Sequence, residues 1–286
     1  MIRKYLYLVL VLFAGVLVSC KNQTNNNKET AEKSQERIVS LSGGITEVLC
    51  ALGYEEQIIG VDVTSTYPKQ IKEKATDLGH VRSVSLEQII GLKPTIVLAS
   101  DKDLNNEVVD KLKQAQIRVE IVSQEQSVEG TKKFIEDIAK IFSSDKHQDL
   151  IANIDAHIQK IQSIEPKPKV LFIYARGAGT LMVAGTNTPM ERIIEIAGGE
   201  NAIKDFADFK PLTSEALIDN NPDVILMFDK GLESLGGIDG LLQIQGVEQT
   251  KAGKNRRIIA MDGGFLTSFG VRLGEAAVEL NTKLKK

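Results

Sequence analysis

Tryptophan is absent from this 286-residue sequence, which has only two cysteines and three histidines. Two of the histidines, His147 and His157, are ten residues apart, so the chain lacks the histidine cluster of a zinc or manganese carrier. It also lacks a Gly-X-Ser-X-Gly turn and a nucleophile beside a histidine base, which argues against hydrolytic chemistry. We therefore expect that the protein is not an enzyme.

No charge sign dominates the composition. The 35 lysines and arginines are balanced by 38 aspartates and glutamates, which gives a formal net charge of −3. Without a basic stripe the sequence lacks the electrostatic pattern of a nucleic-acid-binding protein, so we expect no nucleic acid among its partners. Hydrophobic residues make up 42% of the chain, enough for a substantial core.

Long apolar runs are missing except at the N-terminus. Arg3 and Lys4 precede an apolar run over residues 5–18, which is short for a membrane-spanning helix. The run ends in Leu17-Val18-Ser19-Cys20, which resembles the lipobox of bacterial lipoproteins. This resemblance implies a signal peptide over residues 1–19 and diacylation of Cys20. The alternative is an ordinary transmembrane anchor that ends in cysteine.

The segment after Cys20 is polar. Residues 21–36 contain one apolar residue, Ala31, and cannot bury enough surface to offset the entropy of ordering, so residues 20–36 are predicted to be a flexible tether. We expect the protein in the cell envelope, lipid-anchored, in the periplasm or on the outer face of the cytoplasmic membrane. The lipid anchor would be its only membrane contact. Cys50 then has no disulfide partner, and its position in a helical apolar series indicates a buried, inert thiol.

The remaining sequence contains an internal repeat. Residues 85–100 (SLEQIIGLKPTIVLAS) match residues 213–228 (TSEALIDNNPDVILMF), and each copy has a glutamate seven residues before a proline. In each copy a short amphipathic helix is predicted before the proline and a buried parallel strand after it. Further strands are predicted at 37–41, 58–61, 118–122, 169–173 and 257–261, with helices at 46–52 and 190–197 after the first strand of each half.

Alternating strands and helices in two similar halves predict an α/β protein with two Rossmann-like lobes built on parallel sheets. We expect an N-terminal lobe over residues 37–142, one long linker helix over 143–165 with its N-cap in Ser143-Ser144-Asp145, and a C-terminal lobe over 166–286. Ligands of open parallel sheets bind beyond the carboxyl ends of the strands, so the ligand cleft should lie between the lobes.

Several segments resemble the helix-linked solute-binding proteins of bacterial ABC importers, which serve haem, cobalamin and ferric siderophores. The matching segments include residues 37–53, 60–68, 78–100, 181–202, 209–217, 231–253 and 264–280, and they are most similar to the haem-binding members. The resemblance implies a monomeric binding protein that captures haem b as its transported ligand and delivers it for iron acquisition. The partners it implies are a permease dimer and its ATPase.

The resemblance also assigns site residues. It implies that Tyr67 is the axial ligand of the haem iron, which makes it the metal-binding residue. Tyr67 precedes Pro68, which disfavours helical geometry at the tyrosine and suits the first turn of a following helix. Arg82 is the expected cation beside the phenolate, and Arg176 is a candidate donor to the haem propionates. His80 stands where family members often carry tyrosine, and could be a second ligand, a cleft-lining group or a surface histidine.

Glu87 and Glu215 occupy matching positions in the repeat, and the resemblance implies that they dock the two lobes onto arginines of the permease subunits. The simpler interpretation is two first-turn glutamates that favour the helix dipole. Cobalamin would call for aromatic walls, and a siderophore for several arginines, of which only Arg82, Arg176 and Arg272 qualify. A bilobal metal-dependent enzyme, a remote alternative, would need more cysteine ligands than this chain has.

Overall fold

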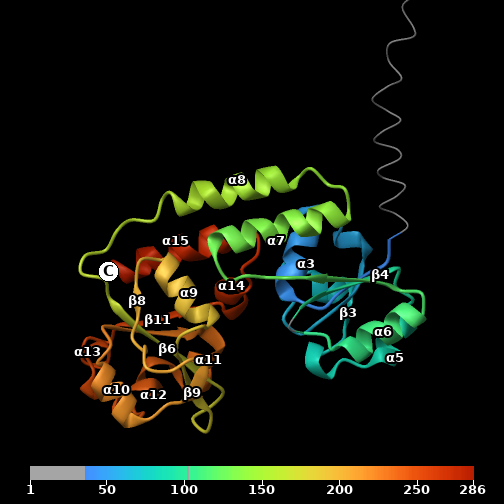
Figure 1. Ribbon diagram of the computed structural model, residues 1–286. Coiled ribbons are helices and arrows are strands. Elements are labelled where there is room, and N and C mark those ends of the chain that lie inside the picture. Colours follow the sequence, from blue (N-terminus) through green and yellow to red (C-terminus); the bar gives the residue numbers. More distant parts are fainter. Residues whose placement is uncertain (1–35, 102) are drawn as a thin grey trace, which may run out of the picture.

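The computed structural model describes residues 36–101 and 103–286, which form two α/β lobes bridged by helices (Figure 1). The N-terminal lobe is built on a parallel five-stranded sheet with the order β3-β2-β1-β4-β5. Its strands are β1 (Ile38–Ser40), β2 (Ile58–Val61), β3 (Thr76–Asp77), β4 (Ile96–Ser100) and β5 (Arg118–Val122). The predicted two-lobed α/β architecture is confirmed.

The C-terminal lobe contains a mixed sheet with the order β11-β10-β6-β7-β9, and β8 pairs with β6. Its strands are β6 (Lys169–Ala175), β7 (Leu181–Ala184), β8 (Glu200–Asn201), β9 (Phe209–Pro211), β10 (Val224–Phe228) and β11 (Ile258–Met261). The expectation of a purely parallel sheet is wrong here, because β7 is antiparallel to both β6 and β9. A short turn, closed by a 3.0 Å hydrogen bond from Arg176 N to Thr180 O, joins β6 to β7, and so short a connection can only join antiparallel strands.

Helices cover both sheets. Those of the N-terminal lobe are α3 (Gly43–Ala51), α4 (Ile71–Lys74), α5 (Leu86–Gly91), α6 (Asn106–Gln114) and α7 (Val128–Ile141), with 3₁₀ turns η1 (Glu55–Gln57) and η2 (Val81–Ser83). Those that follow are α8 (His147–Ile158), α9 (Pro189–Ile196), α10 (Ser214–Asn220), α11 (Asp229–Ser234), α12 (Gly237–Leu242), η3 (Val247–Gln249), α13 (Lys251–Lys254), α14 (Gly263–Thr267) and α15 (Leu273–Leu284). The first helix of each lobe begins earlier than predicted, at Gly43 and at Pro189.

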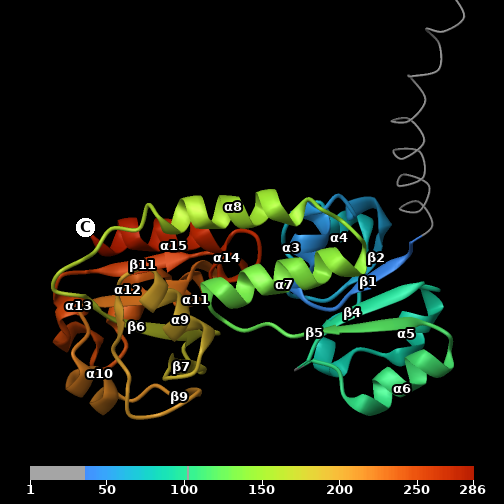
Figure 2. The ribbon, with the colours of Figure 1, turned by 45° about the horizontal axis from the view of Figure 1, so that its top comes forward.

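Two helices, rather than one, bridge the lobes. In Figures 1 and 2, α7 and α8 run side by side across the junction, and Val128 and Ile158 pack against the cores of both lobes. The predicted single helix over residues 143–165 is too long, because α8 covers only His147–Ile158 and its N-cap is Lys146. Gly274 allows α15 to approach α8 closely, since a Cβ there would lie 2.7 Å from the Cβ of His157.

Tertiary contacts explain why α8 ends before the prolines. The backbone of Gln162 is held by the buried side chain of Asn281 in α15, which accepts from Gln162 N at 3.2 Å and donates to Gln162 O at 2.8 Å. Ile161 and Ile164 pack against the C-terminal core. An irregular segment can satisfy all of these contacts, whereas continuing the helix would use the same backbone groups internally.

The repeat forms matching structures in the two lobes. Helix α5 leads into β4 and helix α10 leads into β10, as predicted. Each helix has a hydroxyl N-cap, Ser85 or Thr213, and each is followed, just before its proline, by a residue with positive φ, Lys93 (φ 51°) or Asn221 (φ 40°). The two segments are therefore equivalent in local geometry as well as in sequence.

Candidate ligand-binding site

Tyr67 lies on a loop that hydrogen bonds hold against the first helix. Asp62, buried after β2, accepts hydrogen bonds from Thr64 N (3.1 Å), Thr64 Oγ1 (2.6 Å) and Ser65 Oγ (2.8 Å). Thr64 Oγ1 in turn accepts from Gly43 N at 2.9 Å, which fixes the loop to the start of α3. The loop leaves the Tyr67 side chain 42% exposed. The expected helix start at Pro68 is wrong, because α4 begins at Ile71.

The face of the Tyr67 ring is covered by an arginine from the other lobe. The guanidinium carbon of Arg272 lies 3.7 Å from the centroid of the Tyr67 ring and 5.0 Å from that of Phe265. Glu47 of α3 holds this guanidinium through two hydrogen bonds, Nη2 to Oε1 at 2.6 Å and Nε to Oε2 at 3.0 Å. The side chains of Glu47 and Arg272 are only 3% and 14% exposed, so this is a buried ion pair between the lobes.

Burial controls the ionisation of this pair. Desolvation raises the pKa of Glu47 above its ordinary value, although the hydrogen bond and Coulomb attraction from Arg272 partly oppose the rise. Desolvation lowers the pKa of Arg272, but its hydrogen bond to Glu47 and Coulomb attraction to Glu47 and Tyr67 outweigh that effect and raise the pKa overall. Arg272 therefore stays positively charged beside the Tyr67 ring.

Close backbone packing holds the lobes together around this pair. Gln124 Nε2, beyond the end of β5, donates to Ser268 O at 2.8 Å and to Phe269 O at 3.1 Å. Gly44 faces the same carbonyl, since a Cβ there would lie 2.7 Å from Ser268 O. The glycine is thus needed where helix α3 meets the C-terminal lobe.

Tyr67 and Arg272 line a hollow of about 370 Å³ at the junction, which also includes Glu47, Cys50 and Glu275. Cys50 is only partly buried, not fully buried as predicted, and desolvation raises the pKa of its thiol to about 12, which keeps it protonated near neutral pH. No group of three or more His, Cys, Asp or Glu residues in residues 36–101 and 103–286 is arranged to hold a metal ion.

The expected pairing of Arg82 with Tyr67 is not what the structure shows, because the cation on the Tyr67 ring is Arg272. Arg82 lies in η2, exposed, and its charge acts instead on Asp103, whose pKa is raised by desolvation and by Asp62 but lowered by Arg82 and His80. Proximity in sequence suggested Arg82, whereas the Arg272 contact joins residues more than 200 positions apart. The sequence does contain a sign of the Arg272 contact, because Glu47 is the only charged residue on the apolar helix that follows the first strand.

Arg82 and Arg176 share an unusual property. Of the eight arginines in the described part of the chain, the other six use the guanidinium group to bind a carboxylate or a backbone carbonyl within the protein. Within the same residues the guanidinium groups of Arg82 and Arg176 make no hydrogen bond or ion pair. Both are exposed, one on each lobe, and Arg176 directly follows the carboxyl end of β6.

His80 is exposed at the N-cap of η2. Its Nδ1 accepts a hydrogen bond from Arg82 N at 3.2 Å. In the neutral ring that hydrogen bond places the proton on Nε2, and a protonated nitrogen cannot bind a metal. The conformation in this structure therefore favours a surface histidine at position 80 over an iron ligand.

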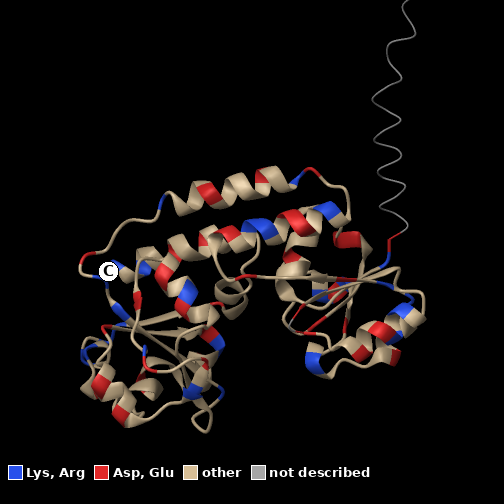
Figure 3. Cartoon of the chain, in the orientation of Figure 1, with Lys and Arg blue, Asp and Glu red and all other residues tan. Residues whose placement is uncertain are grey.

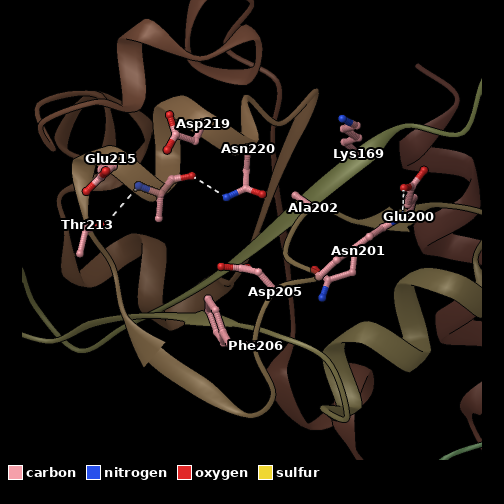
Figure 4. Close-up of a pocket in the computed structure, with 12 residues that line it drawn as sticks. Lys169, Glu200, Asn201, Ala202, Asp205, Phe206, Thr213, Glu215, Asp219 and Asn220 are labelled. Atoms are coloured by element: carbon pink, nitrogen blue, oxygen red, sulfur yellow. Dashed lines mark hydrogen bonds and ion pairs between the residues drawn. The ribbon is translucent and has the colours of Figure 1, made fainter.

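Glu87 and Glu215 are exposed in the first turns of α5 and α10, as predicted. Glu215 also borders a hollow of about 600 Å³ at the outer end of the C-terminal lobe (Figure 4). Lys169, the first residue of β6, lines the same hollow. The hollow therefore lies at the end of the sheet opposite to the junction between the lobes.

Figure 3 shows both charge signs mixed over the two lobes, which fits the absence of a basic stripe.

Comparison with known proteins identifies the family. A family model described as "Periplasmic binding protein" matches residues 38–263. The chain belongs to this family of solute-binding proteins. The periplasmic haem-binding protein RhuT from Roseiflexus sp. RS-1, in its apo form, is 38% identical with a TM-score of 0.83, covering 87% of this chain and 98% of RhuT.

Two further relatives extend the comparison. The uncharacterized ABC transporter substrate-binding lipoprotein YvrC of Bacillus subtilis is 30% identical over 273 residues, 91% of this chain and 83% of YvrC. The vitamin B12-binding protein of Vibrio vulnificus is 26% identical over 81% of this chain and 83% of its own length.

Among the described residues, none of the helices has the length and apolar character needed to span a membrane. Cys20, the predicted signal peptide (1–19) and residues 20–35 of the predicted tether (20–36) lie outside the described residues.

Proposed function

We propose that the protein is the extracytoplasmic solute-binding component of an ABC importer, that its ligand is haem b, and that it delivers haem to a permease and ATPase for iron acquisition. The family membership and the similarity to RhuT support a binding protein rather than an enzyme. The proposal includes diacylation of Cys20 and attachment to the cell envelope through that lipid alone. It also includes a monomeric state.

The observation that carries the proposal is the half-exposed Tyr67 ring with Arg272 on its face. A phenolate oxygen is a known axial ligand of haem iron. Two hydrogen bonds to Glu47 fix the guanidinium of Arg272 against the face of this ring and leave the edge that carries the hydroxyl uncovered by it. Within the described residues the Tyr67 hydroxyl makes no hydrogen bond, so its oxygen is free for iron.

The two unpaired arginines fit the other end of the ligand. Haem carries two propionate groups, and a guanidinium binds a carboxylate through two parallel hydrogen bonds. Among the described residues the guanidinium groups of Arg82 and Arg176 make no hydrogen bond or ion pair, and each belongs to a different lobe. We assign both arginines to the propionates, and we place His80, which lies beside Arg82, at the edge of the same ligand site.

Docking on the permease is assigned to Glu87 and Glu215. Matching carboxylates on two similar lobes suit a partner made of two equal subunits. Both side chains are exposed at the starts of α5 and α10, where helix dipoles also favour negative charge.

A titration with hemin tests the ligand assignment. We expect the protein to give a Soret band together with a charge-transfer band of high-spin phenolate ligation. Tyr67→Phe should lose the charge-transfer band and most of the affinity, because it removes one oxygen and keeps the ring. The matched control is Tyr54→Phe, since Tyr54 is 4% exposed and cannot reach a ligand.

The outcomes separate the alternatives. An unchanged Tyr67→Phe spectrum together with an altered His80→Ala spectrum would move the axial ligand to His80 and leave haem capture in place. Binding of cyanocobalamin with no response to hemin would overturn haem in favour of a corrin, the ligand class named for the Vibrio relative.

A further inference from the structure

Two isoleucines are exposed at equivalent positions of the repeat. Ile90 in α5 is 38% exposed and Ile218 in α10 is 45% exposed. Ile90 is the sixth residue of the first copy and Ile218 is the sixth residue of the second. Their neighbours Ile89 and Leu217, by contrast, are fully buried and anchor each helix to its lobe.

Each isoleucine lies three residues after a docking glutamate, Glu87 or Glu215. Residues three apart in a helix are neighbours on its surface, so each helix presents a carboxylate beside an apolar side chain. One exposed isoleucine on a protein surface needs no explanation. Isoleucines exposed at the same position of both lobes do call for an explanation, because neither side chain contributes to the core of its lobe.

We propose that these pairs, Glu87 with Ile90 and Glu215 with Ile218, are two equal docking patches for one two-fold symmetric partner. The partner is the membrane permease, and each of its subunits presents a basic side chain next to an apolar contact. This inference rests on the proposed docking role of the two glutamates. It adds that the isoleucines supply the part of the affinity that does not depend on salt.

The surroundings of the patches differ in charge. Ser85 Oγ donates to Glu87 Oε2 at 2.7 Å, a bond that lowers the pKa of Glu87, and Lys111 lies close enough to lower it further. Glu215 instead borders the hollow of Figure 4, whose lining also includes three carboxylates (Glu200, Asp205, Asp219) and two lysines (Lys169, Lys204). With four carboxylates against two lysines around Glu215, and Lys111 beside Glu87, the C-terminal patch is the more negative of the two, and we expect it to contribute more of the salt-dependent affinity.

The test compares three isoleucine variants of the full chain. Ile90→Ser and Ile218→Ser alter the patches, and Ile121→Ser is the matched control, because Ile121 is 43% exposed on the edge strand β5, outside both helices. Binding of each hemin-loaded protein to the detergent-solubilised permease–ATPase complex of the same cells would be measured at low and high salt. Burying the exposed part of one isoleucine predicts a loss of about three- to ninefold for each single variant and about ten- to eightyfold for the double variant.

The losses should be the same at both salt concentrations, whereas the losses from Glu87→Arg and Glu215→Arg should shrink at high salt. Hemin titrations of all variants should match the parent, which shows that the fold and the ligand site are intact. If the glutamate variants lose binding and the double isoleucine variant behaves like Ile121→Ser, the isoleucine patches are overturned and the docking glutamates stand. If the glutamate variants also bind normally, the proposed docking surface itself is wrong.

Discussion

Replacement of Arg272 by methionine tests how the lobes are joined. The variant keeps much of the side-chain volume but leaves Glu47, 3% exposed, without its cation. Breaking a buried ion pair by removing one partner costs about 3–5 kcal/mol, and loss of the stacking on Tyr67 adds up to about 1 kcal/mol. We therefore expect the free energy of unfolding to fall by about 4 kcal/mol at pH 7.

The control is Arg256→Met. Arg256 binds Asp239 at 2.6 Å, the same shortest N–O distance as in the Arg272–Glu47 pair, but the two side chains are 55% and 81% exposed. An exposed pair contributes about 0–1 kcal/mol, because water screens it. The comparison therefore separates the effect of burial on the free energy of unfolding from the effect of the N–O distance. Urea unfolding at constant pH measures both variants.

The pH dependence provides a second check. Burial raises the pKa of Glu47 in the folded state, and Arg272 opposes that rise, so the variant should raise it further. A raised folded pKa means that the folded protein binds the proton more tightly than the unfolded chain, and this stabilisation is lost as the pH rises through the folded value. The deficit of Arg272→Met should thus be largest at pH 7–8 and should shrink towards pH 5.

Three results would refute this reasoning. Arg272→Met could be no less stable than Arg256→Met, or its deficit could grow on acidification. The double variant with Glu47→Gln, which removes the stranded charge, could also fail to recover stability relative to Arg272→Met alone.

The remaining predictions concern the ligand, the partner and the membrane. Arg82→Ala and Arg176→Ala should each weaken hemin binding about tenfold while the charge-transfer band remains, because they remove propionate contacts and not the iron ligand; an equilibrium titration followed at the Soret band measures this. Glu87→Arg combined with Glu215→Arg should leave the hemin titration unchanged and abolish haem uptake by cells, and parental uptake rates would show that the docking surface lies elsewhere. Cys20→Ser should prevent lipid attachment, so the protein should no longer fractionate with membranes or incorporate labelled palmitate; labelling like the parent would contradict the lipobox interpretation.

Local patterns in the sequence were sufficient for the elements that a short stretch of chain determines. The segments 58–61 and 118–122 form strands with the predicted bounds. The first is a mostly buried apolar run, whereas the second, RVEIV, is an edge strand whose β-branched residues favour extended backbone. The repeat predicted equivalent helices in both lobes, and Ser85 and Thr213 cap them as their hydroxyl chemistry allows. These features depend on neighbours within a few residues, so the amino-acid order alone determines them.

The features that depend on distant residues were decided by the tertiary structure. Glu47 and Arg272 are 225 residues apart, and only the packing of α3 against the start of α15 brings their charges together beside Tyr67. Helix α8 ends at Ile158 because Asn281 binds the backbone that follows, a constraint that the helical periodicity of the linker does not contain. Periodicity reports which face of an element is buried but not what covers that face, and here the covering residues come from the other lobe or from the last helix.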